Sequence, residues 1–287
     1  MAHQGQLLRL GWRMRIRRYC FVLAFLLVAF PALASSQSRA DAAELLKRVV
    51  ANLKADDLES HSYTFIEDYH NTNYNKKLKI DLDETAKYET VFIEGISYKR
   101  KIEENGKPLG GKAAEEEEKK YQATVAERRR INDELKQTPF HHEYRIPSAY
   151  EEWPNLFTAK NQGEEILEGR HISRMVLTPR PGIKPESDAQ KDALQTSIQL
   201  WIDKADERPL HIKREYTRDG IYMLRGSTIE LFWQKESQNG VYLLNRAFTR
   251  YRANFLGTII SGETNQEFSN YKRFGVDLKV TTEPDQR

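Results

Sequence analysis

Residues 197–216, SIQLWIDKADERPLHIKREY, decide the fold of this chain. From Ser197 to Asp203 apolar and polar residues alternate, which is the period-two pattern of a strand with one buried face. Residues 204–209 are polar and end in a proline, so they predict a turn, and residues 210–216 return as a second strand. This stretch therefore predicts an antiparallel hairpin.

The same alternation recurs on both sides of the hairpin, and Glu94-Gly95 is a tight-turn candidate between two of the segments. In residues 241–251 bulky side chains occur at both parities, which indicates a strand covered on both faces for part of its length. A strongly curved, mainly antiparallel sheet is therefore expected. Its further strand segments are 63–69, 78–83, 88–93, 96–102, 166–177, 227–234, 241–251 and 256–271.

One amphipathic helix precedes the strands. Residues 40–54 place apolar side chains at helical spacing, which predicts about four helical turns with one apolar face. We expect this helix to pack inside or against the curved sheet. Its apolar positions are Ala42, Leu45, Leu46, Val49, Val50 and Leu53.

A charged insertion interrupts the strand pattern at residues 103–163. Residues 112–136 contain no glycine or proline and are rich in strong helix formers, so they predict a charged helix. Two interpretations of this helix stay open, a solvated spacer and a lid over a cavity. The prolines and aromatic residues of 138–163 predict a short helix and loops.

The first 34 residues have the composition of a cleavable secretory signal peptide. Five arginines precede the apolar run 19–30, Pro31 follows it, and Ala32-Leu33-Ala34 supplies the small residues of a cleavage site. The alternative is an uncleaved N-terminal anchor. Cys20 lies at the start of the apolar run, which does not fit a lipoprotein signal, and cleavage would leave a chain without cysteine.

Removal of this segment changes the charge balance. It contains five of the 45 basic residues and none of the 42 acidic ones, so the remaining chain is close to neutral. Such a balance gives no reason to expect a nucleic-acid partner. No stable membrane span is expected after cleavage, and residues 281–287 are expected to form a disordered tail.

The common motifs of catalysis and cofactor binding are missing from the sequence. His141-His142 is the sharpest local cluster, but adjacent residues of a strand point to opposite faces, so the pair is a poor metal chelator. We therefore predict no catalytic residue, no cofactor and no metal site. Carboxylate pairs are too numerous to indicate a glycosidase.

Three further segments carry a resemblance to a known family. They are SYTF at 62–65, SRMVLTP at 173–179, and IQLWID at 198–203 with RPL at 208–210. The chain resembles the outer-membrane lipoprotein-sorting proteins (LolA/LolB-like) and the related RseB-like sensors over residues 38–102 and 164–275. That resemblance implies a half-open, strongly curved β-barrel with helices on its concave face, and non-covalent binding of acyl chains. It implies a single domain over residues 35–280, with the insertion at 103–163.

The leading hypothesis is a non-catalytic periplasmic carrier or binder of lipid or lipoprotein acyl chains. The alternatives are an envelope sensor or protein-interaction module with a packed scaffold and an envelope protein as partner, and, third, a periplasmic hydrolase. The candidate cavity residues are those that share one strand parity. They are Phe65, Leu78, Ile80, Leu82, Phe92, Leu200, Ile202, Leu231 and Trp233.

Overall fold

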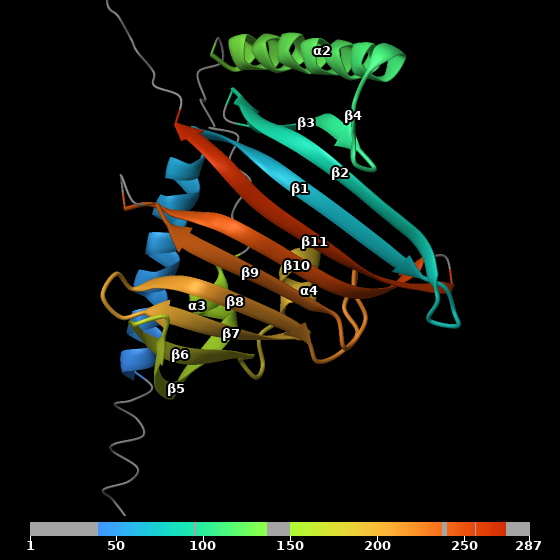
Figure 1. Ribbon diagram of the computed structural model, residues 1–287. Coiled ribbons are helices and arrows are strands. Elements are labelled where there is room, and N and C mark those ends of the chain that lie inside the picture. The colour runs from blue at the N-terminus through green and yellow to red at the C-terminus, as the bar shows by residue number, and fades with distance from the viewer. Residues whose placement is uncertain (1–39, 95, 137–149, 237–239, 256, 274–287) are drawn as a thin grey trace, which may run out of the picture.

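The computed structural model describes residues 40–94, 96–136, 150–236, 240–255 and 257–273. Within them, eleven strands form one antiparallel sheet that curves without closing, with the helices packed on it (Figure 1). The predicted strongly curved, half-open barrel is confirmed. The proposed signal segment 1–34, the tail 281–287 and His141-His142 lie outside the described residues.

The elements follow the predicted alternation closely. The helices are the N-terminal helix at 40–60, α2 (Gly111–Lys136), α3 (Trp153–Leu156) and α4 (Asp188–Ala193). The strands are β1 (Tyr63–Tyr74), β2 (Ile80–Ile93), β3 (Ile96–Glu104), β4 (Lys107–Pro108), β5 (Phe157–Leu167), β6 (Arg170–Pro179), β7 (Thr196–Asp203), β8 (Arg208–Tyr216), β9 (Thr228–Lys235), β10 (Tyr242–Phe255) and β11 (Thr258–Arg273).

Two meanders make up the sheet, and one strand pair joins them. The order is β4-β3-β2-β1-β11-β10-β9-β8-β7-β6-β5, so every neighbour is also consecutive in sequence except β1 and β11. Their pairing runs from Tyr63 opposite Arg273 to Tyr74 opposite Ser261. Strand β1, the first described strand, therefore lies between β2 and β11, the last described strand.

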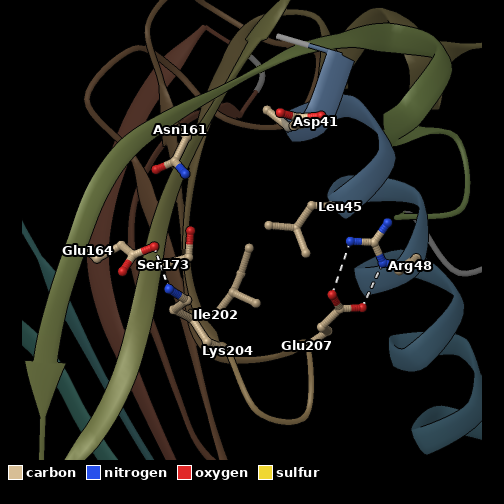
Figure 2. Close-up of a pocket in the computed structure, with 10 residues that line it drawn as sticks. Asp41, Leu45, Arg48, Asn161, Glu164, Ser173, Ile202, Lys204 and Glu207 are labelled. Carbon is tan, nitrogen blue, oxygen red and sulfur yellow. Dashed lines mark hydrogen bonds and ion pairs between the residues drawn. The ribbon is translucent and has the colours of Figure 1, made fainter. Parts of the chain in front are cut away.

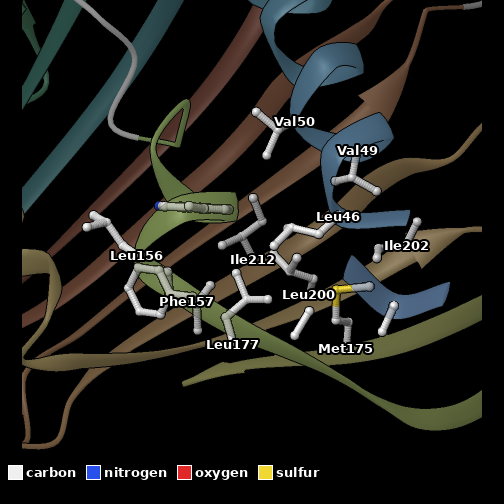
Figure 3. Packing of buried hydrophobic residues seen from close by; sticks show 14 of the residues in the cluster. Leu46, Val49, Val50, Leu156, Phe157, Met175, Leu177, Leu200, Ile202 and Ile212 are labelled. Atoms are coloured by element: carbon white, nitrogen blue, oxygen red, sulfur yellow. The ribbon is translucent and has the colours of Figure 1, made fainter. Parts of the chain in front are cut away.

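The apolar core lies between the N-terminal helix and the β5–β8 part of the sheet (Figure 3). The helix contributes its predicted apolar face, and α3 closes the cluster with Trp153 and Leu156. Burial of each such side chain is worth roughly 1.5–3 kcal/mol. The fully buried members include Leu46, Val49, Phe157, Met175, Leu177, Ile198, Leu200 and Ile202.

The hairpin of β5 and β6 differs from the prediction. Residues 166–177 are two strands joined by a turn at Glu168-Gly169, where both residues have positive φ (50° and 78°). Strand β5 also takes residues 157–163 from the segment that was predicted as helix and loops. Beyond Ala159 its residues are exposed, because β5 is the last strand of the sheet, so no apolar alternation marks it.

Leu46→Ala tests the importance of the helix–sheet core. Leu46 is 1% exposed, so truncation removes its contacts and leaves a cavity. We expect the free energy of unfolding to fall by about 2–5 kcal/mol. Urea denaturation measures this loss, and Leu58→Ala, an exposed position on the same helix, serves as the control. A loss of equal size in both variants would show that the helix does not depend on this face.

Candidate functional site

The N-terminal helix is attached to the sheet by a polar stripe as well as by its apolar face. Arg48, Asn52 and Asp56 follow one another at four-residue intervals, which places them on one side of the helix. All three contact residues 206–208 at the turn between β7 and β8. We call these contacts the helix clamp.

The clamp consists of ion pairs and amide hydrogen bonds. The Arg48 guanidinium donates from Nε and Nη2 to the two carboxylate oxygens of Glu207, at 2.7 and 3.0 Å. The Asn52 amide donates to the carbonyl oxygens of Asp206 and Glu207, at 3.3 and 3.1 Å. Arg208 donates to Asp56 at 2.7 Å. Such bidentate arginine–carboxylate geometry fixes orientation as well as distance.

The acidic residues of the clamp have shifted pKa values. The hydrogen bond from Arg48 lowers the pKa of Glu207, and Lys235 and Tyr242 together lower the pKa of Asp206 by hydrogen bonding to it. Burial raises the pKa of Asp56, and this effect outweighs the opposing hydrogen bond from Arg208. The ion pair with Arg48 therefore requires an ionised Glu207, whereas Asp206 contributes its backbone carbonyl to the clamp and its carboxylate to Lys235 and Tyr242.

A groove of about 340 Å³ opens beside the first turns of the helix. Figure 2 shows Asp41, Leu45 and Arg48 on the helix, across from Asn161 and Glu164 of β5. Lys204 forms an ion pair with Glu164 at 2.5 Å, and this pair links β5 to the turn that holds the helix. The groove is thus bounded by the helix on one side and by the β5–β6 hairpin on the other.

The lining of the groove is apolar inside and charged at its rim. Leu45 is half-buried and contributes most of the apolar surface, since Ala42 and Ile202 behind it are 3% and 0% exposed, and Ser173, which is 4% exposed, contributes a hydroxyl. The rim carries Asp41, Glu164 and Glu207 against Arg48 and Lys204. This balance gives no preference for an anionic head group. The arrangement suits a narrow apolar chain whose polar end remains at the rim.

The structure brings four of the predicted cavity residues together. Leu200 and Ile202 belong to the core under the helix, Ile202 also lines the groove, and Trp233 packs against the same core. Leu231 pairs with the core residue Ile212 and shares its face of the sheet.

The remaining five predicted residues lie elsewhere. Leu78, Ile80 and Leu82 are 78%, 62% and 42% exposed at the far end of the β1–β2 hairpin, away from the N-terminal helix (Figure 1). Phe65 packs against Phe268 and Tyr271, and Phe92 stacks on His61.

The groove residues absent from the prediction come mostly from β5, β6 and the clamp. The Glu168-Gly169 turn, chemically like Glu94-Gly95, was the signal that could have revealed the hairpin.

The face of the sheet that the N-terminal helix covers at β5–β8 is polar where β1, β2 and β11 form it. Glu67 is fully buried, and its two carboxylate oxygens lie 2.8 and 2.6 Å from the Lys99 ammonium. Gln266 donates to the same carboxylate at 2.7 Å. Gln266 pairs with Ala247 on one side and with Tyr69 on the other, and residues paired in this way share a face of the sheet. Glu67, Lys99 and Gln266 therefore lie on the face that the N-terminal helix covers at β5–β8. An apolar ligand is therefore not expected in this part.

A stacked row crosses the opposite face of the sheet. The His211 ring lies 4.2 Å from both Trp201 and Phe232, and Arg174 and Arg246 lie over the outer rings. His211 Nε2 is 3.0 Å from a Glu230 oxygen, and burial lowers the pKa of His211. A histidine beside a carboxylate could act as a base. Its ring faces are both covered by aromatic rings, however, and it does not line either of the two grooves at Ile202 and at Phe232.

The described part of the chain shows neither a metal-binding cluster nor a membrane-spanning helix. No group of three or more His, Cys, Asp or Glu side chains in it is arranged to hold a metal ion. None of its helices combines the length and the apolar character that a bilayer span requires.

Comparison with known proteins gives matches among solved structures only. No family model and no curated protein matches the sequence. A DUF1329 family protein from Desulfovibrio piger is similar with 11% identity and a TM-score of 0.37, over 84% of this chain and 95% of that one. A putative outer membrane lipoprotein-sorting protein domain from Vibrio parahaemolyticus has 11% identity and a TM-score of 0.36, over 82% and 95%.

A LolA superfamily protein from Nitrosomonas europaea is similar with 10% identity and a TM-score of 0.32, over 81% of this chain and 96% of that one. The resemblance to lipoprotein-sorting proteins that the sequence indicated is thus found again among solved structures. At these TM-scores it carries no argument about ligand, partner or site residues.

The helix clamp should weaken in acid. Because Glu207 has a lower pKa in the folded protein than in the unfolded chain, its stabilising contribution is present above the unfolded value of about 4.3 and is lost as the pH falls through the folded value. We expect Glu207→Gln to have a shallower loss of stability between about pH 6 and pH 3 than the wild-type protein. Urea midpoints across this range measure it. Parallel curves would contradict the role of Glu207.

The buried carboxylate of Glu67 provides a second test. Lys99→Ala leaves that carboxylate without its cation, and we expect a loss of about 3 kcal/mol in the free energy of unfolding. The double variant Glu67→Gln with Lys99→Met removes both charges and should recover most of this loss. Thermal denaturation at neutral pH compares the two. A double variant as unstable as Lys99→Ala would show that the charge is not the cause.

Proposed function

We propose that this protein is a non-catalytic binder of a single acyl chain, which lies in the groove between the N-terminal helix and the β5–β6 hairpin. The proposal rests on the groove itself, which has a charged rim and an apolar floor formed by Leu45 over the buried Ile202. Its volume of about 340 Å³ is at the lower end of the range of ligand sites. One narrow chain fits that description better than a bulky ligand.

Affinity in such a site comes from buried area. Each methylene removed from water contributes about 0.8 kcal/mol, so several are needed to offset the cost of immobilising the chain. The rim contributes orientation, since its charges stay in water while the interior excludes it. A lipid or the acyl group of a lipoprotein has this division into an apolar chain and a polar end.

We propose further that the protein acts after export. Residues 1–34 would direct it across the inner membrane and be removed there, so that the domain of residues 35–280 works in the periplasm. Acyl chains of lipids and lipoproteins are available to a binder in that compartment.

An interaction module is the second candidate, and one observation favours it. The core beneath the helix is filled, with Val49, Ile202 and Phe157 at 0% exposure, so the larger part of the helix-covered face offers no cavity. A packed scaffold of this kind would present its surfaces to an envelope protein. The two candidates differ in whether the groove beside Leu45 must stay open.

Filling the groove tests the acyl-chain proposal. Leu45→Trp places a larger side chain in the groove, and Leu58→Trp makes the same change at an exposed position of the same helix. The probe is the methyl ester of cis-parinaric acid, a fluorescent acyl chain with an uncharged head. We expect wild-type protein and Leu58→Trp to bind it alike and Leu45→Trp to bind at least about tenfold more weakly.

The fluorescence titration also has outcomes that contradict the proposal. Equal binding by all three proteins would place the chain outside this groove. Absence of saturable binding to the wild-type protein would favour the interaction module.

A further inference from the structure

The sheet has a long edge at β3 that a helix covers. Strand β4 pairs with Glu103 and Glu104, and the Leu109 N–H donates to the Ile102 carbonyl at 2.8 Å, so residues 96–101 of β3 have no strand beyond them. Helix α2 lies along this edge (Figure 1). Unpaired backbone groups of an edge strand form a template for another strand, so what covers them determines what can bind there.

Side chains of α2 take the positions that a strand would take. Glu117 Oε1 accepts a hydrogen bond from the backbone N–H of Lys101 at 3.3 Å. Arg128 donates to the carbonyl oxygens of Ile96 and Ser97, at 2.6 and 3.1 Å. One helix thus satisfies both donors and acceptors of the β3 backbone through two side chains.

The attachment of α2 to the sheet is light. No residue in 111–134 is buried, and apart from the ring contact of Tyr98 with Tyr121 at 5.5 Å the attachments are polar, such as Arg100 with Glu118 at 2.6 Å and Asn132 with Glu94 at 2.5 Å. The helix also carries its own ion pairs, in which Arg130 contacts Glu127 and Glu134 at helical spacing. Little apolar area is therefore re-exposed if α2 separates from the edge while remaining a helix.

The charge of the covered edge selects what could replace α2. Lys99, Arg100 and Lys101 are consecutive on β3; Arg100 pairs with Glu118 of α2, while Lys99 pairs with Glu67 and Lys101 with Glu104 within the sheet. An extended acidic segment could supply both the backbone pairing and the carboxylate that Arg100 loses when Glu118 leaves. A second copy of this chain would bring the same three bases opposite their equivalents, and like charges across a strand pair are unfavourable.

We propose that the edge of β3 is a docking site for an extended acidic segment of a partner protein, which pairs with residues 96–101 after α2 moves aside. Strand addition at a sheet edge is an established mode of peptide recognition. Gly110 and Gly111 join β4 to α2, and Gly111 has a φ of 54°, so the connection has the backbone freedom that such a movement needs.

Releasing α2 tests the proposal in the full chain. Glu117→Ala with Arg128→Ala removes both side chains that satisfy the β3 backbone. Glu127→Ala with Arg130→Ala is the matched control, since it removes the same charges from an exposed face of the same helix. The probe is a fluorescent nine-residue peptide of alternating glutamate and valine, with a lysine–valine peptide for comparison.

We expect the released variant to bind the acidic peptide about tenfold more tightly than the wild-type protein and the control variant. Lys101→Pro in the released variant should abolish binding, because proline has no N–H to donate outward, while Lys101→Ala should retain it. An equal gain in the control variant, equal binding of the lysine peptide, or binding that survives Lys101→Pro would overturn the proposal. Self-association of the released variant without peptide binding would overturn it as well.

A second measurement serves if the released variant does not fold. In the wild-type protein, excess acidic peptide should slow hydrogen exchange at the Lys101 amide and leave the amides of β5 unchanged. Unchanged exchange at Lys101 would contradict the proposal. The β3 edge and the groove at Leu45 lie on different elements, so failure of acyl-chain binding and failure of peptide binding are separate results.

Discussion

An open sheet cannot bury its own inner face, and in this protein the N-terminal helix does so for one half. The helix has two faces for two tasks. Its apolar residues fill the space over β5–β8, while Arg48, Asn52 and Asp56 fix its position on the β7–β8 turn. Burial supplies stability without direction, and the clamp supplies direction, so together they determine where the helix begins and what it leaves uncovered.

The groove is a consequence of this docking. At the first turns of the helix, the groove separates the helix from Asn161 and Glu164 of β5, and Lys204 pairs with Glu164 at the rim. The other half of the face needs no such cover, because Glu67, Lys99 and Gln266 satisfy one another there. The buried apolar core is concentrated under the helix rather than spread over the whole concave side.

Alternation of apolar residues predicted most strands because the buried face of each is continuous, as in Ile198, Leu200 and Ile202. It could not predict the pairing of β1 with β11, since residues 63 and 273 are brought together only by the complete sheet. Leu78, Ile80 and Leu82 alternate with polar residues as regularly as the core residues do. They are exposed, however, because they lie away from the helix that would bury them. The odd or even position of a residue in its strand identifies the face of the sheet on which it lies. Only the position of the covering helix decides which part of that face is buried.

Native mass spectrometry of the protein isolated without detergent from cells that export it tests the acyl-chain site most directly. We expect a species that carries one acyl-bearing molecule per chain, released on unfolding. A single mass for the chain alone, from protein that remains folded, would contradict it.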